Sequence, residues 1–159
     1  MAQRRFLVVY YSRTGTTRRV AEALAQKLGA DIEEIVDRKR RAGVLGFIVS
    51  GKDAHLQRLT QIEEPRRNPE AYDLVTLGTP VWAFTMSCPV RTYIARFKDR
   101  LPAVAFLLTT GGTGIESTFK DMTQLCGKQP VAQLGLKQRH VRKGDWDQAV
   151  EEFVSKLRS

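Results

Sequence analysis

The sequence predicts an α/β fold in which a parallel sheet carries helices on both faces. Three observations support this prediction. Short apolar runs recur along the chain, segments with helical periodicity separate them, and 159 residues suit one domain at about 100 to 200 residues per domain. Continuous apolar runs are typical of strands buried on both faces, and strands that alternate with helices form parallel sheets. We therefore expect a single domain over residues 1–159.

The first strand and the first helix are the clearest elements of the N-terminal half. Residues 6–11 (FLVVYY) form an apolar, β-branched and aromatic run. From Thr16 apolar residues recur every four positions, until Gly29 supplies a C-terminal stop. Residues 31–36 mix charged and apolar side chains, as an edge strand does. Segment 38–68 is compatible with one amphipathic helix that covers a sheet face, although its glycines weaken this helix.

The C-terminal half continues the alternation of strands and helices. Three more apolar runs predict strands at 73–78, 104–108 and 131–136. One helical pattern follows Pro89, a preferred first-turn residue, and a less regular one covers 115–125. The last helix has an apolar stripe over 146–157, and Asp145 is its expected N-cap. This order completes the pattern of a doubly wound sheet.

Composition and charge limit the function classes. Lys and Arg number 26 against 17 Asp and Glu, a net charge of +9, and 42% of residues are hydrophobic, so the chain should fold rather than form a disordered basic tail. The charge favours anionic partners. No recognised nucleic-acid motif is present, and we expect no nucleic-acid partner. No apolar stretch approaches about 20 residues and no targeting signal is found, so we expect a cytoplasmic protein without stable membrane insertion.

Single residues with chemical potential are few. Cys88 and Cys126 lack the spacing of a zinc or iron–sulfur site, which indicates reduced thiols and no metal. A helix start could lower the thiol pKa of Cys88, but a small packed residue is the better interpretation. We interpret His55 and His140 as surface residues. Residues 38–41 (RKRR) form a basic stretch, which is either a solvated surface or a docking site for an anionic substrate or cofactor phosphate.

The loop after the first strand has the composition of an anion site. Residues 12–17 (SRTGTT) place four hydroxyls and one glycine where a buried strand enters a helix. Free backbone N–H groups and the helix dipole attract an anion there, hydroxyls can donate further bonds, and Gly15 lets the backbone approach closely. Helix capping alone needs one hydroxyl rather than four. The loop therefore predicts a phosphate site.

Two later loops follow strands whose carboxyl ends should lie at the same edge of the sheet, where ligands of doubly wound folds bind. Residues 78–85 (GTPVWAFT) place Trp82 and Phe84 in a segment that we expect to be exposed. Residues 109–114 (TTGGTG) have little side-chain bulk, as where backbone runs against a flat ligand. The first loop lacks a dinucleotide fingerprint, and residues 46–52 imitate a Walker A motif without its Ser or Thr.

Together these loops resemble those of the flavodoxin family. The first is similar to the family's S/T-x-T-G-x-T phosphate motif, and GTPVW and TTGGTG resemble the two loops that clasp the flavin ring. The resemblance extends from Phe6 to Leu157. It implies a flavodoxin-like, doubly wound, five-stranded parallel sheet in the order 2-1-3-4-5, with FMN as cofactor.

The resemblance also implies three groups of FMN contacts. The phosphate would be held by Ser12, Thr14, Gly15, Thr16 and Thr17. The ring would be lined by Thr79, Pro80, Val81, Trp82 and Ala83, with Phe84 as the second aromatic candidate. Its other side would be lined by Thr110, Gly111, Gly112 and Gly114. No catalytic residue is assigned.

The function implied by the resemblance is that of an FMN-dependent oxidoreductase. It would take electrons from NAD(P)H or a partner reductase and reduce a small acceptor such as a quinone, or a protein acceptor, with anionic partners favoured. A one-electron transfer protein without its own substrate is the alternative. Three departures from carrier flavodoxins weigh against the alternative: the chain is basic, the third loop lacks a stacking tyrosine, and the second loop lacks a glycine beside the flavin N5.

Overall fold

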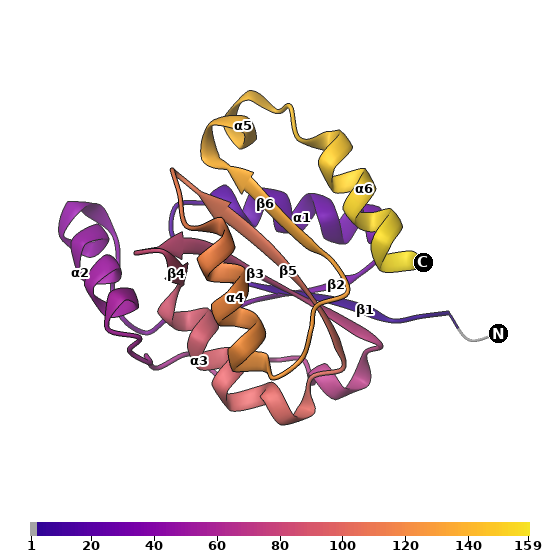
Figure 1. Cartoon of the computed structure of the whole chain (residues 1–159). Helices are drawn as coiled ribbons and strands as arrows, with labels where there is room; N and C mark the ends of the chain where they lie inside the picture. The colour runs from indigo at the N-terminus through magenta and orange to yellow at the C-terminus, as the bar shows by residue number, and fades with distance from the viewer. Residues whose placement is uncertain (1–2) are drawn as a thin grey trace.

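The computed structural model describes residues 3–159 and shows a parallel sheet between helical layers (Figure 1). The parallel strands are β1 (Phe6–Tyr10), β2 (Asp31–Glu34), β3 (Leu74–Trp82), β5 (Ala103–Thr110) and β6 (Gln133–Lys137). They lie side by side in the order β2-β1-β3-β5-β6, and every neighbouring pair is parallel. Numbered along the chain, the parallel strands have the order 2-1-3-4-5. The predicted fold class is therefore confirmed.

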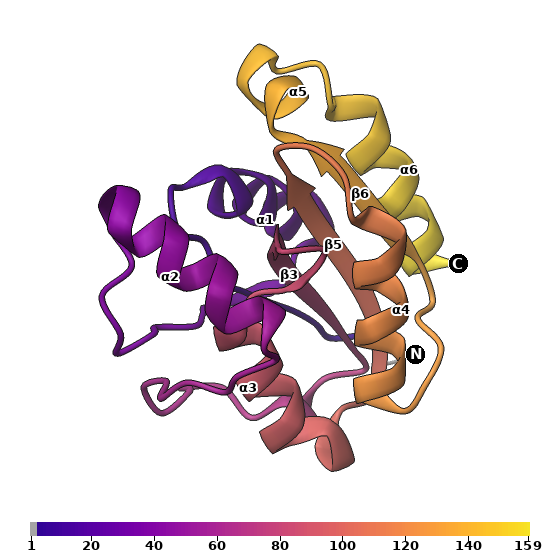
Figure 2. The ribbon, with the colours of Figure 1, turned by 60° about the vertical axis from the view of Figure 1, so that its left-hand side comes forward.

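Helices connect these strands and cover both faces of the sheet. They are α1 (Thr16–Leu28), α2 (Gly43–His55), α3 (Cys88–Phe97), α4 (Ile115–Cys126), α5 (Gln138–Lys143) and α6 (Asp147–Arg158), with short 3-10 turns at Pro69–Ala71 and Lys98–Arg100. α1 and α6 pack on one face and α3 and α4 on the other (Figures 1 and 2). None of the described helices combines the length and the apolar character that crossing a membrane requires.

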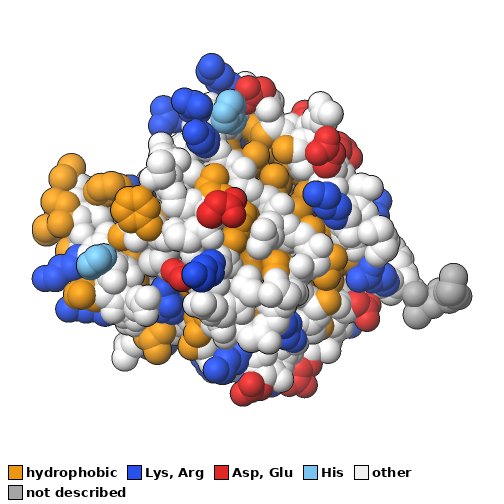
Figure 3. Space-filling view, in the orientation of Figure 1, with side chains coloured by type: hydrophobic (Ala, Val, Ile, Leu, Met, Phe, Trp, Pro, Cys, Tyr) orange, Lys and Arg blue, Asp and Glu red, His pale blue; other side chains and the backbone are white. Residues whose placement is uncertain are grey.

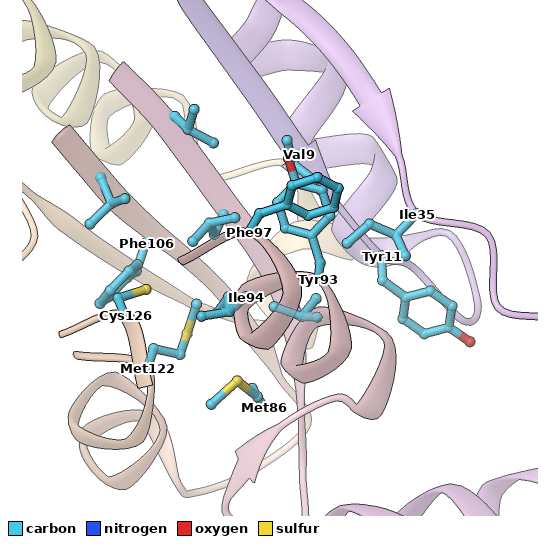
Figure 4. Close-up of a cluster of buried hydrophobic side chains, with 14 of the residues drawn as sticks. Val9, Tyr11, Ile35, Met86, Tyr93, Ile94, Phe97, Phe106, Met122 and Cys126 are labelled. Atoms are coloured by element: carbon cyan, nitrogen blue, oxygen red, sulfur yellow. The ribbon is translucent and has the colours of Figure 1, made fainter. Parts of the chain in front are cut away.

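Two apolar cores, one on each face, fix the sheet. In β1, Leu7 and Val9 belong to the core that α3 and α4 share, whereas Val8 and Tyr10 belong to the core under α1 and α6. Successive side chains of a strand point to opposite faces, so this continuous apolar run is buried on both. Figure 4 shows the first core, in which Tyr93 of α3 and other helical side chains pack beneath the strands. The carboxyl ends of the central strands are thereby held at one edge.

The strand β3 runs further than predicted. Segment 78–85, expected to be an exposed loop, consists of the end of β3, a two-residue turn at Ala83 and Phe84, and the short antiparallel strand β4 (Thr85–Met86). The extension is stabilised because it pairs with β5 as far as Pro80, which lies opposite Thr109. The expectation of an exposed loop is therefore wrong for most of this segment.

The C-terminal region contains a helix that the sequence did not predict. α5 precedes α6 and ends at Gly144, whose φ of +81° lies in the left-handed region that favours glycine. The N-cap of α6 is Trp146 rather than the predicted Asp145. The carboxylate of Asp145 instead lies 3.3 Å from Nδ1 of His140.

The helix α2 forms within the segment where a helix was expected, but its orientation differs. It lies beside the end of the sheet, next to β3, β4 and α3 (Figures 1 and 2). Its buried residues are small or polar: Gly46, Ser50, Asp53 and Ala54. Its exposed residues include Val44, Leu45, Phe47 and Ile48. The expectation that an apolar side of this helix covers a sheet face is therefore wrong.

Close packing explains the small residues on the inner side of α2. A Cβ atom at Gly46 would lie 2.2 Å from the carbonyl oxygen of Arg41, so only glycine lets the helix approach the preceding chain this closely. The inner side contributes little apolar area, and the helix must be held by polar contacts.

Candidate functional site

One cleft brings together the three loops singled out in the sequence. It lies at the carboxyl ends of the central strands, and its lining residues are Ser12, Arg13, Thr14, Thr16, Thr17, Phe47, Pro80, Val81, Trp82, Thr109, Thr110, Gly111 and Gln138. Its volume of about 160 Å³ is below the range of about 300 to 1,000 Å³ that is typical of small-ligand pockets. A ligand bound in this cleft would therefore stay partly exposed.

A larger cavity lies elsewhere on the molecule. It has a volume of about 530 Å³ and lies along the edge strand β2, between residues 32–36 and 63–67. The residues that line it include no predicted site residue and no residue of the three loops. We therefore take the smaller cleft as the candidate site.

The first loop ends at the N-terminus of α1 with donors facing the cleft. Gly15 is the N-cap with a φ of +100°, and within residues 3–159 no side chain caps this helix end. The hydroxyl of Ser12 accepts a hydrogen bond from the Gly15 N–H (3.0 Å), and that of Thr16 accepts one from Nε2 of Gln138 (3.4 Å). Both hydroxyl hydrogens are therefore free to donate. Together with the positive helix end, they suit an anion such as phosphate.

Thr17 and Thr109 join the first loop to the third. Their hydroxyl oxygens lie 2.8 Å apart in a buried contact, and either can be the donor. One hydroxyl hydrogen makes this bond, and the other remains for a ligand. The phosphate contact of Thr17 stays a prediction. Thr109 was not predicted as a site residue, although its place at the start of the glycine-rich stretch was a usable signal.

Trp82 forms an aromatic wall of the cleft. Tyr11 packs edge-on against it with ring centroids 5.5 Å apart, and the guanidinium of Arg41 lies 5.1 Å from the centre of the Trp82 ring. Burial, with a smaller contribution from Asp37, raises the pKa of Tyr11 to about 12, so Tyr11 is neutral and serves as a packing partner. Phe84 is 63% exposed and is not among the lining residues. Contact of either aromatic with a flavin ring stays a prediction.

The turn between β3 and β4 borders the cleft. Its residues Ala83 and Phe84 have φ values of +48° and +66°, as both central residues of a type I′ turn do. Ser117 of α4 donates a hydrogen bond to the carbonyl of Phe84 (2.6 Å). A Cβ atom at Gly114 would lie 2.9 Å from Cα of Phe84. Gly114 therefore lets α4 begin directly against this turn, and its predicted ring contact stays untested.

Two more predicted residues support the cleft without lining it. Thr79 is buried, its hydroxyl accepts a hydrogen bond from the Ser87 N–H (3.0 Å), and it lies 2.9 Å from the Ser87 hydroxyl. These contacts fix the start of α3. Gly112 lies in the exposed turn after β5, where its N–H donates to the hydroxyl of Thr110 (3.1 Å). Their predicted contacts with FMN stay predictions.

Besides Thr109, three lining residues were missed by sequence reasoning. Arg13 lies inside the phosphate-like loop, so its position was the signal, and its guanidinium lies 5.4 Å from the ring centre of Phe47. Phe47 reaches the cleft because α2 stands beside the sheet end, which no local pattern indicates. Gln138 follows β6 directly, at the same edge of the sheet as the other loops.

A buried ion cluster holds α2 beside the cleft. Arg41, whose side chain is 2% exposed, forms ion pairs with Asp37 and with Asp53, the latter at 3.1 Å. Asp53 also accepts from Lys39 (2.6 Å) and Arg58 (3.2 Å). Burial alone would raise the pKa of Asp53, but hydrogen bonds from its three cationic partners lower it below its ordinary value. Arg41 is therefore not part of the basic surface that the stretch 38–41 suggested.

The cysteines and histidines lie outside the cleft lining. Cys88 is completely buried at the start of α3, and burial raises the pKa of its thiol more than the neighbouring Arg41 lowers it. The structure thus supports a packed rather than a reactive thiol. Cys126 is also a free buried thiol. Neither His55 nor His140 is among the residues that line the cleft.

Comparison with known proteins relates this architecture to solved structures. No family model and no curated protein matches the chain. The FMN complex of a flavoprotein from Lactobacillus acidophilus NCFM matches with a TM-score of 0.72 at 18% identity, over 89% of this chain and 98% of that one. An NADH:FMN oxidoreductase in its apo form matches with a TM-score of 0.57 at 13% identity, over 96% and 86%.

A flavodoxin from Pseudomonas aeruginosa also matches, with a TM-score of 0.56 at 14% identity, over 97% of this chain and 99% of that one. The strand order and the cleft at the carboxyl ends define a doubly wound α/β protein with a cleft at the place where ligands of such folds bind. The likeness to the solved structures makes the fold specific: the chain has the flavodoxin-like fold.

Proposed function

We propose that the protein is an FMN-binding oxidoreductase that passes electrons from NAD(P)H or a partner reductase to a small acceptor such as a quinone. The observation that carries this proposal is the shared cleft. The uncapped, hydroxyl-rich N-terminus of α1 opens into the same space as Trp82 and the end of β5. The helix N-terminus at one end suits the phosphate of FMN. The aromatic wall at the other end, with a loop of little side-chain bulk, suits its flat ring.

Different residues of the cleft would bind the phosphate and the ring of FMN. Ser12, Thr14 and Thr16 would donate hydroxyl hydrogen bonds to the phosphate, and Arg13 would add positive charge beside it. Trp82 would line the ring on one side, with Gly111 and its neighbours along the other. Bound FMN would supply the redox chemistry, while the protein positions it and tunes its potential.

The shape of the cleft is compatible with an enzyme. A volume of about 160 Å³ cannot enclose a small ligand at the scale of about 300 to 1,000 Å³, so one part of a bound ring would remain accessible to a nicotinamide or a flat acceptor. A one-electron transfer protein remains the second candidate, since a flavodoxin is among the similar structures. The two free buried thiols support our further proposal that the protein works in the cytoplasm.

The decisive experiment is a titration of the cofactor-free protein with FMN and, separately, with FAD, followed by flavin fluorescence. We expect tight, FMN-selective binding that Thr14→Ala weakens, because Thr14 lies in the phosphate-like loop. Ser155→Ala, which removes an exposed hydroxyl on α6, is the matched control and should bind normally. Anaerobic addition of NADH or NADPH, then of a soluble quinone, tests electron transfer. Absence of FMN binding at micromolar concentration would refute the proposal.

A further inference from the structure

The outer side of α2 is apolar and uncovered. Val44, Leu45, Phe47 and Ile48 have exposed fractions between 59 and 78%. Figure 3 shows these side chains gathered over α2 at the left of the molecule. The helix thus turns its small and polar residues inward and its large apolar residues outward, the reverse of an ordinary surface helix. Contiguous exposed apolar side chains of this kind mark interaction surfaces.

The exposed charges of the segment that carries this apolar surface have one sign. Within segment 36–60 the exposed ionised side chains are Arg38, Lys39, Arg40, Lys52 and Arg58. The acids of the segment, Asp37 and Asp53, have side chains only 2% and 5% exposed, and both are paired with Arg41. Figure 3 shows blue side chains below the orange group at the left of the molecule. The surface of α2 and its flanks therefore presents apolar side chains inside a basic rim.

We propose that α2 docks the protein on an anionic lipid bilayer. An interfacial helix inserts its apolar side chains at the headgroup boundary, while Lys and Arg attract anionic headgroups. The outer side of α2 and its basic rim match both requirements. A second copy of the chain fits less well, because docking of the same surface on both copies would bring two basic rims together. A convex helix with protruding aliphatic side chains also suits a deformable lipid surface better than a rigid protein face.

Docking through α2 would place the candidate site at the membrane. Phe47 belongs both to the apolar side of α2 and to the lining of the cleft, so the cleft opens beside the docking surface. An acceptor dissolved in the bilayer would then meet the cleft directly. This consequence rests on the proposed function, whereas the docking itself requires no cofactor.

Vesicle co-sedimentation of the full chain tests the proposal. We expect binding to equimolar phosphatidylcholine and phosphatidylglycerol, little binding to phosphatidylcholine alone, and weakening by added salt. Leu45→Ser combined with Ile48→Ser should lower the partition coefficient by about tenfold or more, because two inserted aliphatic groups are lost. Val131→Ser, an exposed apolar residue outside α2, is the matched control and should bind as the unmodified protein does.

A charge series tests the basic rim separately. Arg38→Gln and Arg40→Gln should each lower binding about fivefold, at about 1 kcal/mol per basic residue near the surface. Lys120→Gln and Lys156→Gln, on α4 and α6, should leave it unchanged. Equal binding to both vesicle types, or equal loss in the α2 and control variants, would overturn the proposal. The proposal would also be overturned if the protein formed a dimer that binds no vesicles and that dissociates on Leu45→Ser with Ile48→Ser. FMN titration is independent of vesicles, so failure of docking and failure of flavin binding are distinguishable.

Discussion

Replacing Arg41 with Met should release α2 from the body of the protein. The buried guanidinium joins Asp37, which precedes the helix, to Asp53 within it, and its Nη1 also donates to the hydroxyl of Ser50 (3.2 Å). Removal of one partner from a buried ion pair costs about 3 to 5 kcal/mol. Because Asp53 keeps two further cations and Asp37 keeps the hydroxyl of Thr60, we expect the lower end, about 3 kcal/mol. For a chain of this length that lowers Tm by roughly 6 to 12 °C.

The effect of Arg41→Met should depend on pH. In the unmodified protein the pKa of Asp53 is lowered, so its contribution to stability is present above the unfolded value of about 3.9 and is lost as pH falls through the lower folded value. Without Arg41, fewer cations oppose the effect of burial on Asp53, so its pKa in the folded variant is higher than in the unmodified protein. As pH falls, protonation of Asp53 then removes the cost of its buried negative charge in the variant. The difference in unfolding free energy between the two proteins should therefore narrow from pH 7 toward about pH 4.

Urea unfolding at both pH values measures this difference. Arg58→Met is the control, because Arg58 pairs with the same carboxylate from a side chain that is about half exposed, and it should cost less than about 1 kcal/mol. A loss below about 1 kcal/mol for Arg41→Met, or a difference that stays constant with pH, would refute this account of how α2 is anchored.

Three further predictions concern the cleft and its border. Thr14→Ala with Gly15→Val should weaken FMN binding more than about tenfold in a fluorescence titration, because a donor is lost and a β-branched residue is forced toward a φ of +100°. Gly114→Ala should lower the free energy of unfolding by about 1 to 3 kcal/mol in urea, because its Cβ would press on Phe84. The two one-electron potentials of bound flavin should lie close together in a spectroelectrochemical titration. A one-electron carrier separates them by stabilising the semiquinone, commonly through a backbone peptide that flips toward the flavin N5, and the turn at Ala83, anchored by Ser117, resists such a flip; widely separated potentials would indicate a one-electron carrier.

Local sequence patterns predicted the part of the site that is formed by residues adjacent in the chain. The apolar run of β1, the loop 12–17 and the periodicity of α1 are adjacent in sequence, and buried strands and amphipathic helices leave strong signals. The strand order needed the resemblance as well, because alternating strands and helices fit several doubly wound arrangements.

The parts that the sequence did not predict depend on distant pairings. The orientation of α2 is set by the contacts of Arg41 with Asp37 and Asp53, which outweigh the apolar pattern of the helix. The extension of β3 depends on pairing with β5. The turn at Ala83 and Phe84 contains none of the Gly or Asn residues that usually indicate a type I′ turn, so its sequence carried no signal.

The two walls of the cleft differ in how they are secured, and this difference bears on the kinetics of ligand exchange. One wall is the end of β3, and the turn that follows it is fixed by the bond from Ser117 to Phe84 and by the hydroxyl of Thr85, which donates to Asp121 (2.7 Å). A preorganised wall needs no ordering when a ligand binds. A second wall includes Phe47 on α2, a helix tethered by ionised groups. We therefore expect Arg41→Met, which weakens this tether, to shorten the residence time of a bound ligand, because Phe47 would then move with α2.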